Sequence, residues 1–298
     1  MQLDLKKLST ETRNPDTRNL DTMTALELVT AMNREDHKIP EAIRPMLPNI
    51  ARAVEYAVSS LSAGGRLIYM GAGTSGRLGV LDAVECPPTF GVDPDVVVGL
   101  IAGGEKAFVK AVEGAEDSEE LGRQDLQNIG LRKEDFLVGI AASGRTPYVL
   151  GGLAYAKSVG CHTAAISCNP GSAVGSSADL AIEVVPGPEV LTGSTRLKAG
   201  TCQKLILNMI STASMVRSGK AYENLMVDVM QTNEKLVVRA QNIVMEATGV
   251  DRDTAAEKIR QAEGSCKTAI TMILADCTAE EAVSRLEKAK GHVREAIL

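Results

Sequence analysis

The sequence predicts an α/β protein, a doubly wound parallel sheet followed by a small all-helical subdomain. Short apolar runs alternate with segments of helix length, and most of the runs are continuously apolar, as in strands buried on both faces. Each run is bounded by Gly, Pro, Asn or Asp, and the strand pattern disappears after about Asn233. Alternating strands and helices imply parallel strands joined by crossover connections.

The first 40 residues read as a polar N-terminal arm. Pro15 and Pro40 interrupt it, and a short helix is expected near Thr24–Asn33. An amphipathic helix follows at roughly Ile43–Ala63, and the pair Gly64-Gly65 closes it.

The central domain is expected to span residues 41–232 and to hold the whole sheet. The predicted strands are Arg66–Met70, Val96–Ala102, Phe136–Ala142, His162–Ser167 and Leu180–Val185. The predicted helices are Gly76–Val84, Ser118–Ile129, Pro147–Val159 and a long one near Thr195–Arg217. This order of elements is that of an open sheet with helices on both faces.

The last predicted unit is a small helical subdomain over residues 233–298. We expect three or four short helices, with breaks near Gly249, Gly264 and Asp276–Thr278. Thr278, followed by two glutamates, resembles a helix cap with acids in the first turn.

Composition argues against nucleic-acid and membrane partners. The net charge is −6, no dense Lys/Arg run exists, and the chain has no Trp, five Tyr and three Phe, so basic patches and stacking platforms are scarce. The polar N-terminus lacks the apolar core of a signal peptide, and the apolar runs are too short to span a bilayer. We therefore expect a cytoplasmic protein.

The six Cys and three His suggest no metal site. No C-x-x-C pair occurs, and His37, His162 and His292 lie far apart in the sequence. We expect the thiols to be free and buried, as in a reducing compartment, and we expect no cofactor.

The turn GAGTSGR, Gly71 to Arg77, is the first candidate binding element. It leads from a strand into a helix, where free backbone N–H groups and the helix dipole attract an anion. It also matches the dinucleotide pattern G-x-G-x-x-G, but the next strand ends in Gly103-Gly104 rather than in an acid for the ribose. The hydroxyls suit a phosphate monoester, with Gly73, Thr74, Ser75 and Gly76 as predicted contacts. The motif alone is equally compatible with a tight connection that binds nothing.

Two further turns carry hydroxyl groups. AASGRTP follows a predicted strand and offers Ser143, Gly144 and Thr146 as contacts, at the sheet edge where open α/β sheets bind ligands. TGSTRLK opens the long helix and offers Ser194, with Lys198 as a positive charge near the anion, and we also expect Ser194 or Thr195 to cap that helix.

Two carboxylates are candidates for acid–base chemistry. Glu85 precedes Cys86-Pro87-Pro88, where we expect the helix to end, and partial desolvation there would raise its pKa. Glu116 lies among other acids, and its spacing alone favours a solvated acidic face.

Several long strings together resemble the N-acetylmuramic acid 6-phosphate etherases, a family of the sugar isomerase (SIS) superfamily. The strings are GAGTSGRLGVLDAVECPPTF, AVEGAEDS, ASGRTPYV, GSTRLKAGTCQKLILNMIST and the N-terminal TETRNPDT, and the resemblance covers nearly the whole chain. It implies a homodimeric lyase without metal that cleaves the D-lactyl ether of N-acetylmuramic acid 6-phosphate, giving N-acetylglucosamine 6-phosphate and D-lactate, in murein recycling. By the family pattern Glu85 matches the acid and Glu116 the base.

The implied chemistry is consistent with two carboxylates and a phosphate anchor. Ring opening exposes an aldehyde and acidifies the carbon 2 proton, which the base removes while the acid protonates the departing lactate oxygen; water then adds. A non-catalytic SIS regulator needs no such pair, and an aldose–ketose isomerase returns the proton to carbon 1. The group that opens the ring stays unassigned.

One geometric problem accompanies this assignment. Glu85 lies nine residues after Gly76, and a straight helix would separate them by roughly 13 Å, which is far for one sugar phosphate. We therefore expect the helix to be short or broken, at Gly79 for example, or a partner subunit to complete the site.

Overall fold

The computed structural model describes residues 8–110, 112–231 and 233–298. It divides into two compact units, one of residues up to Val84 with Asp95–Ser211, and one of Glu85–Pro94 with Thr212–Leu298. The second unit thus contains residues before 233 as well as the expected helical subdomain. The start of the predicted arm, residues 1–7, lies outside the described residues.

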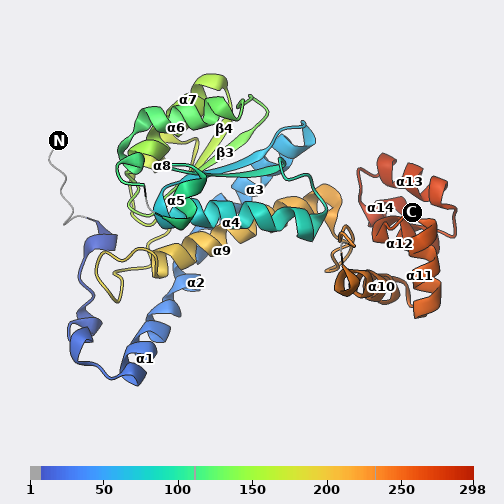
Figure 1. Cartoon of the computed structure of the whole chain (residues 1–298), viewed down its shortest axis with the longest axis horizontal. Coiled ribbons are helices and arrows are strands. Elements are labelled where there is room, and N and C mark those ends of the chain that lie inside the picture. Colours follow the sequence, from blue (N-terminus) through green and yellow to red (C-terminus); the bar gives the residue numbers. More distant parts are fainter. Residues whose placement is uncertain (1–7, 111, 232) are drawn as a thin grey trace. The chain divides into compact units, whose positions relative to one another are not determined.

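The first unit is built on a parallel sheet, as predicted (Figure 1). Within the described residues its order is β2-β1-β3-β4-β5, so the chain winds one way from β1 to β2 and the other way from β3 onward. The strands are β1 Leu67–Gly71, β2 Val97–Ile101, β3 Phe136–Ala141, β4 His162–Ser167 and β5 Leu180–Glu183. Each lies within two residues of its predicted bounds, because runs buried on both faces are readable as strands.

Helices cover both faces of the sheet. On one face α6 Glu119–Asn128, α7 Pro147–Val159 and α8 Ala173–Ser177 pack over a buried cluster that includes Ile68 and Met70 of β1. The intervening Tyr69 points to the other face, where α3 Leu47–Ser62 and α4 Gly73–Phe90 lie. The predicted bounds of α7 are those observed.

The N-terminal arm contains more helix than expected. A capping box between Thr24 and Glu27 starts α1 Ala25–Asp36, and α2 Lys38–Ile43 follows. The single helix expected at Ile43–Ala63 is divided by a 3-10 turn at Arg44–Met46, which contains a proline that lacks an N–H donor.

Helix α4 is longer than predicted, and two expectations about it are wrong. It runs without a break past Gly79, whose missing side chain serves packing: a Cβ there would lie 2.9 Å from the Cβ of Tyr69. It also continues beyond Glu85 through Pro87 to Phe90. Pro87 and Pro88 lie in the last turn of α4. The Pro87 carbonyl still accepts a hydrogen bond from the N–H of Gly91 at 2.9 Å.

A buried carboxylate joins α4 to the long helix α9 Lys198–Met215. Oδ1 of Asp82 accepts hydrogen bonds from Asn208 Nδ2 at 2.8 Å and Ser211 Oγ at 3.2 Å. Burial raises the pKa of Asp82 despite these hydrogen bonds. A raised pKa in the folded state means that ionisation of Asp82 works against folding.

Replacing Asp82 by Asn should therefore change the pH dependence of stability. As pH rises above the unfolded carboxyl value of 3.8, the native protein loses part of the free energy of unfolding that protonated Asp82 provides, whereas the Asn variant does not. The stability of the variant relative to the native protein should therefore grow with pH in urea titrations. The same change at exposed Asp21 controls for net charge, and equal pH profiles for the variant and the native protein would contradict this account.

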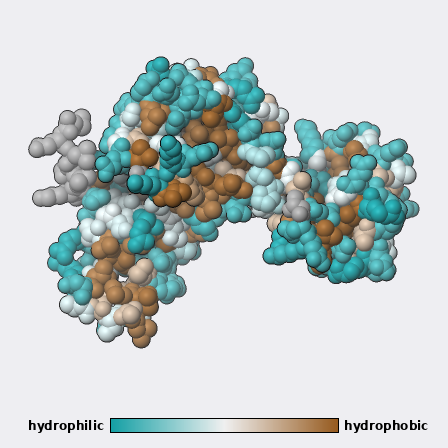
Figure 2. Space-filling model, viewed as in Figure 1, coloured by the Kyte–Doolittle hydropathy of each residue, from teal (hydrophilic) through white to brown (hydrophobic). Residues whose placement is uncertain are grey.

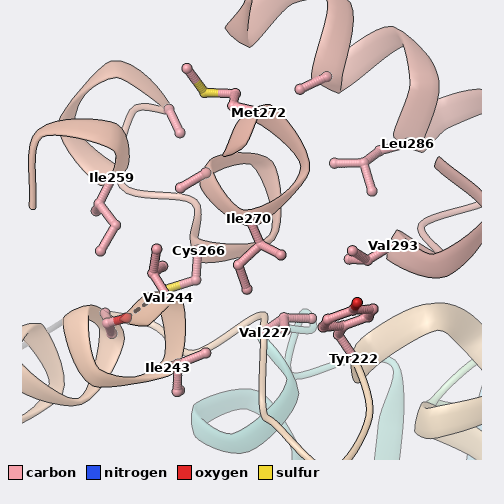
Figure 3. Close-up of a cluster of buried hydrophobic side chains, with 14 of the residues drawn as sticks. Tyr222, Val227, Ile243, Val244, Ile259, Cys266, Ile270, Met272, Leu286 and Val293 are labelled. Atoms are coloured by element: carbon pink, nitrogen blue, oxygen red, sulfur yellow. Dashed lines mark hydrogen bonds between the residues drawn. The ribbon is translucent and has the colours of Figure 1, made fainter. Parts of the chain in front are cut away.

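The second unit has its own hydrophobic core (Figure 3). Val244, Ile259 and Ile270 from three helices meet there, and the Cys266 thiol faces the Ala240 carbonyl. The helices are α10 Glu234–Thr248, α11 Arg252–Gln261, α12 Cys266–Leu274, α13 Ala279–Lys288 and α14 Val293–Ala296. Breaks at Gly249 and Gly264 and the Thr278 cap are confirmed. The described residues of this unit thus contain more helices than the three or four expected. The additional helix, α14, has four residues and is too short to be recognised from hydrophobic periodicity in the sequence.

Candidate active site

A cavity of about 290 Å³ lies beyond the carboxyl ends of β1 and β2 in the first unit. It is lined by Ala72, Gly73, Arg77, Ala102, Ala107, Val112, Glu113, Gly114 and Glu116. The structure thus brings the start of the glycine-rich turn and one of the two candidate glutamates together. Glu85 is not among the lining residues, and it belongs to the second compact unit.

Packing and backbone geometry explain the glycines of the turn. A Cβ on Gly76 would lie 2.6 Å from the Gly71 carbonyl oxygen and 2.7 Å from Ile101 Cγ1, so only glycine lets α4 approach the sheet this closely. Gly73 has a φ of 52°, which disfavours other residues, and no heavy atom lies within 4 Å of a Cβ built on it. The first turn of α4 therefore opens toward the cavity with backbone N–H groups that the helix itself does not use.

The hydroxyls of the turn have different surroundings. Thr74 is half-buried, whereas Ser75 is 6% exposed and its Oγ donates to Gln203 Oε1 of α9 at 2.9 Å. Gln203 is itself 1% exposed. Sequence reasoning missed Gln203 because its partner lies 128 positions away in the chain.

One wall of the cavity is fixed by Arg77 of α4. Its Nε donates to the Phe108 carbonyl and its terminal nitrogen to the Ala107 carbonyl, each at 2.8 Å. These bonds hold α5, Glu105–Val109, beside the start of α4. The Arg77 guanidinium also brings a positive charge to the cavity lining.

Glu116 lies on a 3-10 helix, Ala115–Asp117, that follows a left-handed Gly114. The buried Ala115 anchors this segment in the core beneath α7, and the exposed Glu116 lines the cavity. Glu113 lines it as well. Sequence spacing did not separate Glu116 from the neighbouring acids. In the fold, Glu113 and Glu116 are the two carboxylates that line this cavity, so the candidates for a base there are reduced to two.

The second predicted turn follows β3, the neighbour of β1 in the sheet. Gly144 has a φ of 74°, and a Cβ there would lie 2.4 Å from Ser172 Cβ, so the turn is packed tightly against the start of α8. Ser143 and Thr146 are both half-buried, and Ser143 Oγ accepts the N–H of Arg145 at 3.3 Å. None of these residues lines the cavity that holds Glu116.

The third predicted segment has a structural ion pair at its end. The Lys198 side chain is 1% exposed, and its Nζ lies 2.6 Å from Glu35 Oε2 and 3.1 Å from the Pro186 carbonyl oxygen. The buried Glu189 carboxylate accepts the N–H groups of Lys198 and Ala199 at 2.9 Å each. Glu189, rather than Ser194 or Thr195, thus caps α9, and Ser194 lies half-buried in the preceding loop.

The N-terminal arm packs beside these turns. Asn169, which follows β4, accepts the Ser9 N–H at 2.7 Å and donates to Thr10 Oγ1 at 3.2 Å and to the Ala142 carbonyl at 3.0 Å. Thr17 donates to the Val190 carbonyl at 2.9 Å.

A carboxylate of the arm also reaches the loop that carries Ser194. The Glu11 carboxylate would lie 3.3 Å from a Cβ built on Gly193. The motif TETRNPDT, which sequence reasoning could place only by resemblance, therefore borders two of the predicted binding turns.

The thiols have the character expected of buried cysteines. None of the six takes part in a disulfide among the described residues; Cys277 is half-buried and the others are buried. Burial raises the pKa of Cys202 to about 12 and that of Cys266 to about 11, so both stay protonated at neutral pH.

The part of the chain that the structure describes holds neither a metal-ligand cluster nor a helix suited to cross a membrane. Its His, Cys, Asp and Glu side chains form no group of three or more that could hold a metal ion. None of its helices combines the length and apolar character needed to cross a membrane.

Relatives with this sequence pattern span the whole chain. The N-acetylmuramic acid 6-phosphate etherase of Exiguobacterium sp. is 61% identical over 293 residues, which cover 98% of this chain and 100% of that protein. The etherase of Geobacillus sp. is 59% identical over 293 residues, covering 98% and 99% of the two chains. This chain belongs to the N-acetylmuramic acid 6-phosphate etherase family. The family resemblance drawn from the sequence motifs is thereby confirmed.

The chain also matches two models of SIS domains. The SIS domain matches residues 109–217, and the glucokinase regulatory protein N-terminal SIS domain matches residues 49–157. Among solved structures, a phosphoheptose isomerase from Neisseria gonorrhoeae superposes with a TM-score of 0.51 at 19% identity, covering 64% of this chain and 98% of that one. This likeness confirms the SIS-type fold of the chain.

Proposed function

We propose that the protein is a lyase that cleaves the D-lactyl ether of N-acetylmuramic acid 6-phosphate to give N-acetylglucosamine 6-phosphate and D-lactate. Membership of the etherase family over the full chain, at 61% identity, is the observation that carries this proposal. Elimination followed by water addition needs a base, an acid and an anchor for the phosphate, and the chain offers a candidate for each.

The phosphate is proposed to bind at the start of α4. Gly73, Thr74, Ser75 and Gly76 present the helix N-terminus, whose free N–H groups and dipole favour a dianion. Ser143, Gly144 and Thr146 follow the adjacent strand β3 at the same sheet edge and are proposed to complete the sugar phosphate site with Ser194. Lys198 is proposed to add positive charge near the anion, but its buried pair with Glu35 offsets much of that charge, so its contribution to phosphate binding is small.

Glu116 is proposed as the base that removes the carbon 2 proton. It lines the same cavity as Gly73 and is exposed, so a sugar anchored at the turn can reach it. Glu85 is proposed as the acid that protonates the lactate oxygen and later activates water. Because α4 has no break that would bring Glu85 back toward the turn, we favour an active site completed by a partner subunit.

The assembly is proposed to be a cytoplasmic homodimer. Apolar side chains remain exposed on the first unit, among them Leu26 at 74% and Val29 at 57% on α1 (Figure 2). A second subunit that covers such surface would remove it from water. Sedimentation velocity of the purified protein should give twice the chain mass, and a concentration-independent monomer would contradict the dimer.

The activity itself has a direct test. Purified protein incubated with N-acetylmuramic acid 6-phosphate should release D-lactate in amounts equal to the N-acetylglucosamine 6-phosphate formed. N-Acetylglucosamine 6-phosphate as the only substrate, which lacks the ether, controls for contaminating lactate. Phosphate-ester binding without lactate would instead favour a non-catalytic SIS regulator, and a ketose product would favour an isomerase.

A further inference from the structure

The carboxamide of Gln203 is a buried polar group with unused hydrogen-bonding capacity. Its Oε1 accepts from Ser75, but its Nε2 is shielded from solvent and has no partner among the residues that the structure describes. A buried donor without a partner costs about 1–3 kcal/mol, and such groups are rare in folded proteins. Gln203 is 1% exposed, so bulk water does not satisfy it.

The partner of Gln203 lies in the proposed phosphate turn. Ser75 is in the first turn of α4, where α9 runs close alongside: a Cβ on Gly200 would lie 3.4 Å from Thr74 Cγ2. A hydroxyl has one proton, and in this arrangement Ser75 donates it to Gln203. A phosphate dianion only accepts hydrogen bonds, so Ser75 cannot donate to it while the Ser75 proton is bonded to Gln203.

We propose that Gln203 is a positioning residue that switches the direction of the Ser75 hydrogen bond when a sugar phosphate binds. The carboxamide turns over, Nε2 then donates to Ser75 Oγ, and Ser75 donates its proton to a phosphate oxygen. The resulting chain of aligned donors ends on an anion, where each bond strengthens the next. The amide oxygen takes the place of Nε2, and buried carbonyl oxygens tolerate incomplete hydrogen bonding better than N–H groups do. This inference rests on the proposed phosphate site.

Two substitutions of Gln203 distinguish this role from a purely structural one. An ionised Glu at this position only accepts, so it keeps the Ser75 proton and repels the phosphate. At about pH 9, where this carboxyl is ionised, Gln203→Glu should therefore raise the KM for N-acetylmuramic acid 6-phosphate and the Ki of inorganic phosphate by about tenfold or more, with kcat within about threefold. Gln203→Met offers neither an acceptor nor a donor to Ser75 and adds no charge, so Ser75 loses its alignment and both constants should rise by about three- to fivefold, less than in Gln203→Glu.

The pH profile gives a second readout. A protonated Glu can still donate to Ser75, so the KM of Gln203→Glu should rise between about pH 7 and pH 9 as the buried carboxyl ionises. The native enzyme should show no such rise from this position, because an amide does not titrate. Thermal unfolding of each variant reports whether the fold is retained.

A double-mutant cycle tests whether Gln203 acts through Ser75. Adding the uncharged Gln203→Met to Ser75→Ala should weaken phosphate binding no further than Ser75→Ala alone. The control Asn208→Met removes a comparable amide from α9, where it is bonded to Asp82, and should leave the Ki of phosphate unchanged.

The outcomes separate this inference from the proposed function. If native protein releases D-lactate and Gln203→Glu binds phosphate normally, the inference is wrong and the function stands. Additive effects in the cycle, or native constants in Gln203→Met, would also overturn it, and the Met variant decides if the Glu variant fails to fold. Absence of D-lactate from the native protein overturns the function, whereas Ser75→Ala with normal phosphate binding overturns the role of Ser75 on which the inference depends.

Discussion

Replacing Glu116 by Gln should abolish the exchange of the carbon 2 proton with solvent and, with it, the release of D-lactate. An amide cannot accept the proton, and loss of a general base lowers rates by about 10²–10⁴-fold. Glu116 and the proposed phosphate turn line one cavity, so the variant should still bind inorganic phosphate. Proton exchange is measured by incorporation of deuterium into the substrate in heavy water.

Two further variants make this result specific. Glu113 lines the same cavity, and Glu113→Gln should leave the exchange rate within about threefold of the native rate. Glu85→Gln should release little lactate yet still exchange the carbon 2 proton, because the acid is needed only for departure of the lactate oxygen. Native exchange in Glu116→Gln would mean that another group, with Glu113 the first candidate, is the base.

Removing the Lys198 ammonium should destabilise the fold strongly. Both side chains of the Lys198–Glu35 pair are 1% exposed, so Lys198→Met leaves a buried carboxylate without its main partner. Loss of one member of a buried ion pair costs about 3–5 kcal/mol of the free energy of unfolding. Urea unfolding followed by circular dichroism measures the loss. Lys38, whose side chain is 52% exposed, also contacts Glu35, and Lys38→Met should cost less than about 1 kcal/mol.

The pH dependence of stability and a double variant test whether the lost ion pair causes the destabilisation of Lys198→Met. Burial alone would raise the pKa of Glu35, but the hydrogen bonds and charges of Lys198 and Lys38 outweigh it and lower the pKa. The pair therefore stabilises the native protein above the unfolded carboxyl value of 4.5 and loses that contribution as pH falls below it. The deficit of Lys198→Met should accordingly shrink at acid pH, and adding Glu35→Gln should restore much of the lost stability at neutral pH. A full deficit in the double variant would show that packing, not charge, is responsible.

The sheet could be predicted from the sequence because its signal is local. Strands such as Phe136–Ala141 are continuously apolar, and helix Pro147–Val159 begins at a proline and ends before a left-handed glycine. The extent of α4 could not be predicted, because the penalty of Pro87 depends on which turn of the helix it occupies.

The site was predicted less completely because its contacts are non-local. Glu35 and Lys198 are 163 positions apart, and no residue pattern near either one indicates that they pair. The same holds for Ser75 and Gln203, which are 128 positions apart. Glu116 faces the cavity because the adjacent Ala115 is buried and Gly114 adopts a left-handed conformation. The spacing of acidic residues in the sequence contains no information on either feature.

The docking of the N-terminal arm also has a consequence for biosynthesis. Ser9 bonds to a residue 160 positions later, and Thr17 to one 173 positions later. At translation rates of about 5–20 residues per second, the arm waits on the order of ten to thirty seconds on the ribosome before its partners exist. The arm is thus synthesised well before the residues on which it docks, and chaperones or proteases that survey nascent chains meet it while it is still undocked.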